Sequence, residues 1–137
     1  MIIAIDFDGT IVDHKYPEIG HELPFATATI RKLIEDRHQV ILWTVRQGEL
    51  LQEAIEWCKA RGIEFYAVNK NFPEEEVTDS RAFNKINAEI FIDDRNLGGL
   101  PDWGRIYQMI SEKKSWKDIY TKTEEPLHRK RKRKWLW

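Results

Sequence analysis

Oxygen-bearing side chains gather where the first apolar run of the chain ends. Residues 2–5 form that run, and Asp6, Asp8, Gly9 and Thr10 follow it closely. An Ile-rich run predicts a strand buried on both faces, and Asp is a poor strand residue, so the two carboxylates indicate a site at the strand's end. Alternation would point Asp6 and Asp8 the same way, and their repulsion would imply a cation or a shared proton. Gly9 would let a ligand approach the backbone.

Two later apolar runs also end in oxygen-bearing side chains. Residues 40–43 predict a second strand that ends at Thr44, and residues 90–92 predict a further strand that ends at Asp93 and Asp94. The carboxyl ends of parallel strands meet at one edge of a sheet, where α/β proteins bind their ligands. Three strands would therefore bring carboxylates or hydroxyls to the same edge.

Helices must alternate with these strands to position them. Residues 65–68 predict one more strand, and apolar spacing predicts helices over about residues 24–37, 47–61 and 103–113. Pro24 could open the first of these helices at its first helical position. The alternation predicts an α/β fold, a Rossmann-like three-layer sandwich with a mainly parallel sheet. Cys58 falls on the apolar stripe of the second helix, so we expect it in the core rather than as a nucleophile.

Length and composition indicate one globular domain. The chain has 137 residues, 42% of them hydrophobic and 33% charged, and no apolar stretch approaches the ~20 residues that span a bilayer. The N-terminus does not look like a secretory signal, and a single cysteine excludes an internal disulfide and a multi-cysteine metal site. We therefore expect a cytoplasmic protein, with a folded core over residues 1–120 and a basic tail over residues 121–137.

The predicted site contains hard oxygen ligands and no cluster of His or Cys. Such ligands suit Mg²⁺ that keeps some waters and accepts a substrate phosphate, and four carboxylates could contribute: Asp6, Asp8, Asp93 and Asp94. A carboxylate can also attack phosphorus and form an aspartyl-phosphate. Thr44 could donate a hydrogen bond to the transferring group. Lys85 is the cation best placed in the sequence, although a surface lysine is the default interpretation.

These residues resemble the motifs of the haloacid dehalogenase superfamily of phosphohydrolases, over roughly the first 110 residues. Residues 6–10 match the first motif, Asp-x-Asp-Gly-Thr after an apolar strand. Residues 41–44 match the second, an apolar strand that ends in Thr or Ser. Lys85 matches the third motif, and residues 90–94 match the fourth. Their order and spacing both fit the family.

The resemblance implies a role for each motif residue. Asp6 would be the nucleophile, and Asp8 would protonate the leaving group and then activate water. Thr44 and Lys85 would hold the phosphoryl oxygens. Mg²⁺ would bind the main-chain carbonyl of Asp8 and the carboxylates of Asp6 and Asp93, with Asp94 as a ligand through water or an orienting neighbour. The family's first strand is central, and an acid at position 8 is typical of its phosphatases and phosphotransferases.

Cap domains, which decide substrate class in this family, are inserted between its motifs. The 36 positions from Asp8 to Thr44 and the 41 from Thr44 to Lys85 hold only a loop, a helix and a strand each, so we expect no cap domain. Open sites in the family accompany large substrates, or oligomers whose neighbours close the site. Substrate contacts would then come from loops, with Gly9, Thr10 and Arg46 as candidates. Arg46 could equally be a surface arginine at a helix start.

The charge of the chain is unevenly distributed. Residues 128–134 carry six of the 22 Lys and Arg and no acid, which leaves 16 basic against 23 acidic residues elsewhere, a formal charge of −7. This tail could bind nucleic acid, and its aromatic end, residues 135–137, could stack on bases. The alternative functions are therefore a nucleic-acid-associated binding protein or a polynucleotide phosphatase. We favour a solubilising or docked tail, because an acidic body repels a polyanion.

Overall fold

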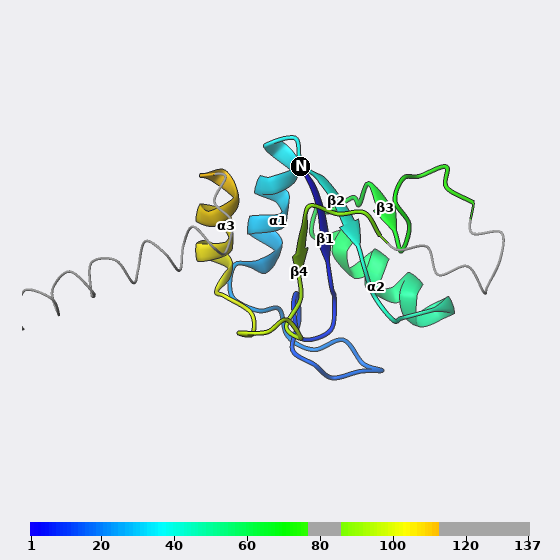
Figure 1. Cartoon of the computed structure of the whole chain (residues 1–137). Coiled ribbons are helices and arrows are strands. Elements are labelled where there is room, and N and C mark those ends of the chain that lie inside the picture. The colour runs from blue at the N-terminus through cyan, green and yellow to red at the C-terminus, as the bar shows by residue number, and fades with distance from the viewer. Residues whose placement is uncertain (77–85, 113–137) are drawn as a thin grey trace, which may run out of the picture. The chain divides into compact units, whose positions relative to one another are not determined.

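The computed structural model describes residues 1–76 and 86–112 (Figure 1). The chain divides into two compact units, Met1–Trp103 and Gly104–Trp137. Helix α3 (Trp103–Ser111) begins at the last residue of the first unit. Lys85, most of the predicted turn at 83–86 and the basic tail lie outside the described residues, so the expectations for them stay predictions.

A four-stranded sheet forms the centre of the first unit. Its strands follow the order β3-β2-β1-β4, and all three pairings are parallel. The strands span Ile2–Ile5 (β1), Gln39–Leu42 (β2), Ala67–Val68 (β3) and Ile90–Ile92 (β4). The predicted α/β Rossmann-like fold is confirmed, and β1 lies inside the sheet between β2 and β4 (Figure 1).

The strands end level with one another. Ile5 pairs with Leu42 on one side and with Ile92 on the other. Backbone hydrogen bonding between the strands continues one residue past these pairs. The Asp6 amide donates to the Ile92 carbonyl at 3.0 Å, and the Trp43 amide donates to the Ile5 carbonyl at 2.8 Å. The residues that follow three strands therefore meet at one edge.

Both faces of β1 are covered, as its apolar sequence predicts. On one face, Phe7 just beyond the strand packs edge to face on Trp57 of helix α2 (Gly48–Ala60), with ring centroids 5.8 Å apart. On the other face, Ala4 belongs to a buried cluster with Ile41, Ala67 and Ile86. This burial excludes water from the sheet and holds the strand ends in fixed positions.

Helix α1 (Ala26–Glu35) lies beside the end of α2. The Arg31 guanidinium donates to the Arg61 carbonyl, which follows α2, at 2.6 Å. The two crossovers β1-α1-β2 and β2-α2-β3 run in the same direction across the sheet, which places their helices on one face. Cys58 is buried on α2, so its assignment to the core is confirmed.

Two sequence expectations about element ends are wrong. Pro24 does not open α1, because Phe25 lies between it and the helix with φ 65°, a left-handed conformation that an α-helix cannot contain. The strand predicted over residues 65–68 is reduced to Ala67–Val68, and the chain turns at Asn69, which has φ 54°. Asn tolerates this conformation better than most residues, so it ends the strand here.

The intervals that could hold a cap domain are short. The chain from β1 to β2 forms a loop and α1, and residues 45–76 form α2, β3 and connecting loops. The described parts of these intervals contain no additional domain. No helix in residues 1–76 and 86–112 is long and apolar enough to cross a membrane.

Candidate active site

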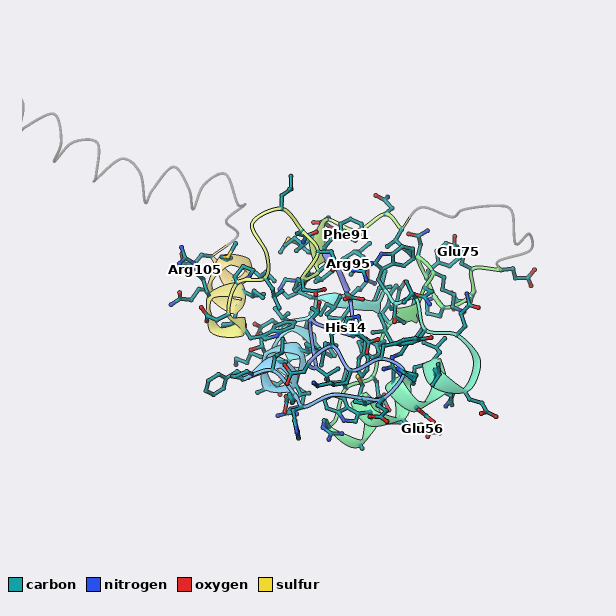
Figure 2. All side chains as sticks on the ribbon, turned by 90° about the horizontal axis from the view of Figure 1, so that it is seen from below. His14, Glu56, Glu75, Phe91, Arg95 and Arg105 are labelled. Carbon is teal, nitrogen blue, oxygen red and sulfur yellow. The ribbon has the colours of Figure 1, made fainter. Side chains whose placement is uncertain are left out.

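Three carboxylates converge at the carboxyl edge of the sheet. One oxygen each of Asp6, Asp93 and Asp94 lie within 4.8 Å of one another. Asp6 follows β1, whereas the other two follow β4. Figure 2 looks onto this edge, with His14 on the loop after β1 and Arg95 on the loop after β4. The convergence that parallel strands predict for these three residues is therefore present.

The three carboxylates are held against their mutual repulsion. Burial, and then the charge of Asp93, raise the pKa of Asp6 from 3.8 to about 7. Burial also raises the pKa of Asp93, and the neighbouring Asp94 adds to that rise. Such groups resist being charged together unless protons or a cation compensate them. These three carboxylates could therefore hold a cation.

Thr10 joins the two loops that carry these carboxylates. Its hydroxyl lies 3.2 Å from Asp6 Oδ2 and 3.4 Å from Asp94 Oδ1, and it accepts a hydrogen bond from the Asp94 amide at 3.1 Å. The Trp103 indole donates to the Thr10 carbonyl at 3.0 Å. Thr10 is fully buried, and through these bonds it positions Asp6 and Asp94. The contact with a substrate expected of it stays a prediction.

Gly9 allows the β4 loop to come close to the β1 loop. It has φ +83°, and a Cβ atom added there would lie 2.3 Å from Asp94 Oδ2. Real Cβ atoms do not approach an oxygen so closely. The close approach that was expected of a ligand is thus made by the Asp94 carboxylate.

The Asp8 carboxylate turns away from the other three and pairs with Arg46. Arg46 Nε donates to Asp8 Oδ2 and Nη2 donates to Asp8 Oδ1, both at 2.7 Å. Arg46 is 0% exposed and Asp8 is 7% exposed. The Asp8 carboxylate is therefore not one of the three that converge, because it pairs with a buried cation instead. This pairing raises the pKa of Arg46. The metal contact implied for the main-chain carbonyl of Asp8 stays a prediction.

All five N–H groups of the Arg46 guanidinium have acceptors. Besides the two bonds to Asp8, Nη1 lies 3.1 Å from the Pro17 carbonyl and 3.4 Å from the Leu50 carbonyl, and Nη2 lies 2.9 Å from the Glu18 carbonyl. The interpretation of Arg46 as a surface arginine is thus wrong. A contact with the leaving group would require it to give up one of these bonds.

Thr44 is fixed by the loop that follows β3. Its amide donates to Asn69 Oδ1 at 2.8 Å, and its hydroxyl oxygen accepts a hydrogen bond from the Arg46 amide at 3.2 Å. Accepting this bond uses a lone pair of the hydroxyl and leaves its proton for donation. Thr44 is half-buried and follows β2 at the same edge as the carboxylates.

Asn69 and Trp103 shape the site but were not predicted to do so. Asn69 is the polar residue directly after β3, so the strand-end rule that selected Asp6 and Thr44 could have selected it too. The Trp103 indole holds the Thr10 carbonyl by a hydrogen bond, and no spacing in the sequence predicts that contact.

Comparison with solved structures shows a close relative. The chain is similar to a conserved protein from Bacteroides thetaiotaomicron, with 62% sequence identity over 88% of this chain and 97% of that chain, and a TM-score of 0.79. The α/β chain described above therefore belongs to the family of that conserved protein. No protein-family model matches the chain, and no curated protein matches it either.

Proposed function

We propose that the protein is a Mg²⁺-dependent phosphohydrolase of the haloacid dehalogenase type that forms an aspartyl-phosphate on Asp6. The convergence of Asp6, Asp93 and Asp94 at the carboxyl edge of the sheet is the observation that carries this proposal. The resemblance of residues 6–10 and 90–94 to two motifs of that superfamily adds to it. Lys85, the third-motif residue, remains part of the proposal from sequence alone.

The donor set of the site fits Mg²⁺. Hard carboxylate oxygens are its preferred protein ligands, and Asp6, Asp93 and Asp94 could supply them together with the Asp8 carbonyl. A bound cation would relieve the repulsion that raises the pKa of Asp6, and would neutralise charge on a phosphate. Zinc does not fit, because the ligands are all oxygen.

The reaction would proceed in two displacements. An Asp6 oxygen attacks the phosphorus of a phosphate monoester, and the bond from phosphorus to the ester oxygen breaks while that oxygen takes up a proton. A water then attacks the same phosphorus, the bond to Asp6 breaks, and inorganic phosphate leaves with regeneration of the carboxylate. Thr44, whose amide donates to Asn69 Oδ1, would donate its hydroxyl proton to a phosphoryl oxygen.

Asp8 is the proposed proton exchanger, and Arg46 constrains how it acts. Two charge-assisted hydrogen bonds from Arg46 orient the Asp8 carboxylate, which would accept a proton from the attacking water. To protonate the leaving oxygen in the first step, Asp8 must loosen at least one of these bonds. The proposal therefore includes a partial opening of the Asp8–Arg46 pair.

Phosphate release from a panel of monoesters tests the proposal. We expect the wild-type protein to turn over substrate with Mg²⁺ and to lose that turnover with a chelator. The Asp6→Asn protein should have a turnover rate lower by ~10³-fold or more, because an amide cannot attack phosphorus. Glu35→Gln, an exposed acid at the end of α1, serves as the control and should retain activity.

A second measurement looks for the covalent intermediate. Rapid acid quenching with labelled substrate should leave label on the wild-type protein that hydroxylamine removes, as it does from acyl phosphates. The Asp6→Asn protein should carry none. Absence of turnover from every ester in the panel, with correctly folded protein and Mg²⁺ present, would refute the proposal.

A further inference from the structure

Trp43 lies beside Asp6 at the edge of the sheet. Leu42 pairs with Ile5, and the Trp43 amide donates to the Ile5 carbonyl at 2.8 Å. Trp43 and Asp6 are therefore each one residue past this pair, on adjacent parallel strands. Residues at the same register of parallel strands point to the same face, and adjacent strands lie about 4.8 Å apart.

The shared face is the one opposite α2. Phe7 packs on Trp57 of α2, so Asp6, which alternates with it, points to the other face. That face is the one on which Ala4 and Ile41 cluster, and Trp43 follows Ile41 by two residues. Trp43 thus flanks Asp6 on the β2 side.

Asp93 flanks Asp6 on the opposite side. Ile92 pairs with Ile5, so Asp93 is the β4 residue one step past that pair. Three side chains therefore follow one another along this edge, on the same face of the sheet: Asp93 after β4, the proposed nucleophile Asp6 after β1, and Trp43 after β2. Cation ligands lie on one side of the nucleophile, and an aromatic surface lies on the other.

The Trp43 side chain is partly open to solvent. It is 39% exposed, and Val45, which follows on the same loop, is 78% exposed. The exposed part of the indole is accessible to a bound ligand. Indole faces bind planar aromatic groups by stacking, so this surface has the chemistry of a platform for such a group.

We propose that Trp43 contacts the substrate and that the site selects phosphate monoesters whose ester oxygen carries an aromatic ring. The inference rests on the proposed function, because it assumes that the phosphoryl group sits at Asp6. A ring on the ester oxygen is two bonds from phosphorus and leaves with that oxygen. Trp43 is the strand-end neighbour on the side of Asp6 away from Asp93. Trp43 contributes binding only and takes no part in bond making or breaking.

Paired esters test this selection. Values of kcat/KM for phenyl phosphate and ethyl phosphate are measured with Mg²⁺ for the wild type, Trp43→Ala and Trp43→Phe. We expect Trp43→Ala to lower the value for phenyl phosphate about 10-fold, the usual effect of a lost stacking contact, and to change that for ethyl phosphate less than about 2-fold. Trp43→Phe should restore most of the loss. Comparing each variant with the wild type on the same ester removes the difference in leaving-group reactivity.

A matched control is available on the neighbouring strand. Phe91 of β4, labelled in Figure 2, is 42% exposed but pairs with Ala4, two residues before the edge. Phe91→Ala should leave the ratio of the two esters unchanged. A phenyl phosphate group carried on a short peptide, compared with the free ester, shows whether a small molecule or a protein side chain is the better source of the ring.

Binding without turnover separates this inference from the proposed function. Calorimetry with Mg²⁺ should find phenylphosphonate about 10-fold tighter than methylphosphonate in the wild type and no such difference in Trp43→Ala. The inference alone is overturned if turnover requires Asp6 but Trp43→Ala affects both esters equally and both phosphonates equally. Discrimination between phosphonates without turnover of any ester supports the aromatic platform and overturns hydrolysis. If the wild-type protein shows neither turnover of any ester nor discrimination between the phosphonates, both the inference and the proposed function are overturned.

Discussion

Arg46 and Asp8 form a bidentate ion pair inside the first unit, with Arg46 Nε and Nη2 each 2.7 Å from an oxygen of the Asp8 carboxylate. Neither residue is appreciably exposed. The pair also ties the carbonyls of Pro17 and Glu18 to the end of β2 through the same guanidinium. It therefore holds the loop after β1 in place while it neutralises Asp8.

Removing one partner of this pair should be costly. Asp8→Ala or Arg46→Ala leaves an uncompensated buried charge, and we expect a loss of about 3–5 kcal/mol in the free energy of unfolding. Urea denaturation measures it, with the exposed Glu64→Ala as the control, expected within about 0.5 kcal/mol of the wild type. The double variant should lose less than the sum of the two single variants. Strictly additive losses would contradict a coupled pair.

Gly9→Ala and Gly99→Ala should differ although both glycines have a left-handed backbone. Their φ angles are +83° and +78°, so both substitutions carry a similar strain of about 1–2 kcal/mol. A Cβ at Gly9 would collide with the Asp94 carboxylate, whereas a Cβ at Gly99 meets nothing within 4 Å. Gly9→Ala should therefore be the less stable variant and the one with weakened Mg²⁺ binding by calorimetry. Equal effects of the two substitutions would argue against the close approach.

Asp6 should make the metal-free protein less stable as the pH rises. Its folded pKa of about 7 lies above the unfolded value of 3.8, so its contribution is present below about pH 4 and is lost as the pH rises to about 7. The loss should be smaller than the ~4 kcal/mol that this shift implies at about 1.4 kcal/mol per pKa unit, because Asp6 is partly exposed and water screens its interactions. Urea denaturation with a chelator between pH 4.5 and 7.5 measures it.

The Asp6→Asn protein is the reference for that series. Other carboxylates titrate in both proteins, so the difference between the two curves isolates Asp6. The curves should separate progressively toward pH 7.5, with Asp6→Asn the more stable. Parallel curves would show that burial and Asp93 do not disfavour the charged form of Asp6.

Cys58 should react with thiol reagents only when the protein unfolds. It is fully buried, and burial raises the pKa of its thiol to about 12, so the reactive thiolate is scarce at pH 8. Labelling in urea should follow the unfolding transition. Ala60→Cys, which adds an exposed cysteine at the end of the same helix, should gain one fast-reacting thiol. Fast native labelling of Cys58 would contradict its place in the core.

The sequence predicts the sheet and the three converging carboxylates well. Apolar runs, parallel topology and strand ends determine these features, because Asp6 and Asp93 are one residue past a strand and Asp94 is two residues past it. The direction of the Asp8 side chain is not predicted in this way. Strand β1 ends at Ile5, so the alternation of side chains along a strand does not extend to a residue three positions later.

The partners of Arg46 are harder to predict for a different reason. Three of its five bonds go to backbone carbonyls, at Pro17, Glu18 and Leu50, and the position of a loop carbonyl depends on the folded chain rather than on residue type. A polar segment that holds an arginine is usually exposed. Sequence reasoning therefore favours the surface for a residue that is in fact buried.

The bonds between Thr10 and Asp94 join residues 84 positions apart. Parallel pairing of β4 with β1 must precede them, and contacts between such distant residues form late because closing a long loop costs entropy. The carboxylate site is therefore complete only when the last strand has joined the sheet. If the site binds Mg²⁺ as proposed, the ion would bind only the chain in which β4 is paired with β1, and it would stabilise that paired state.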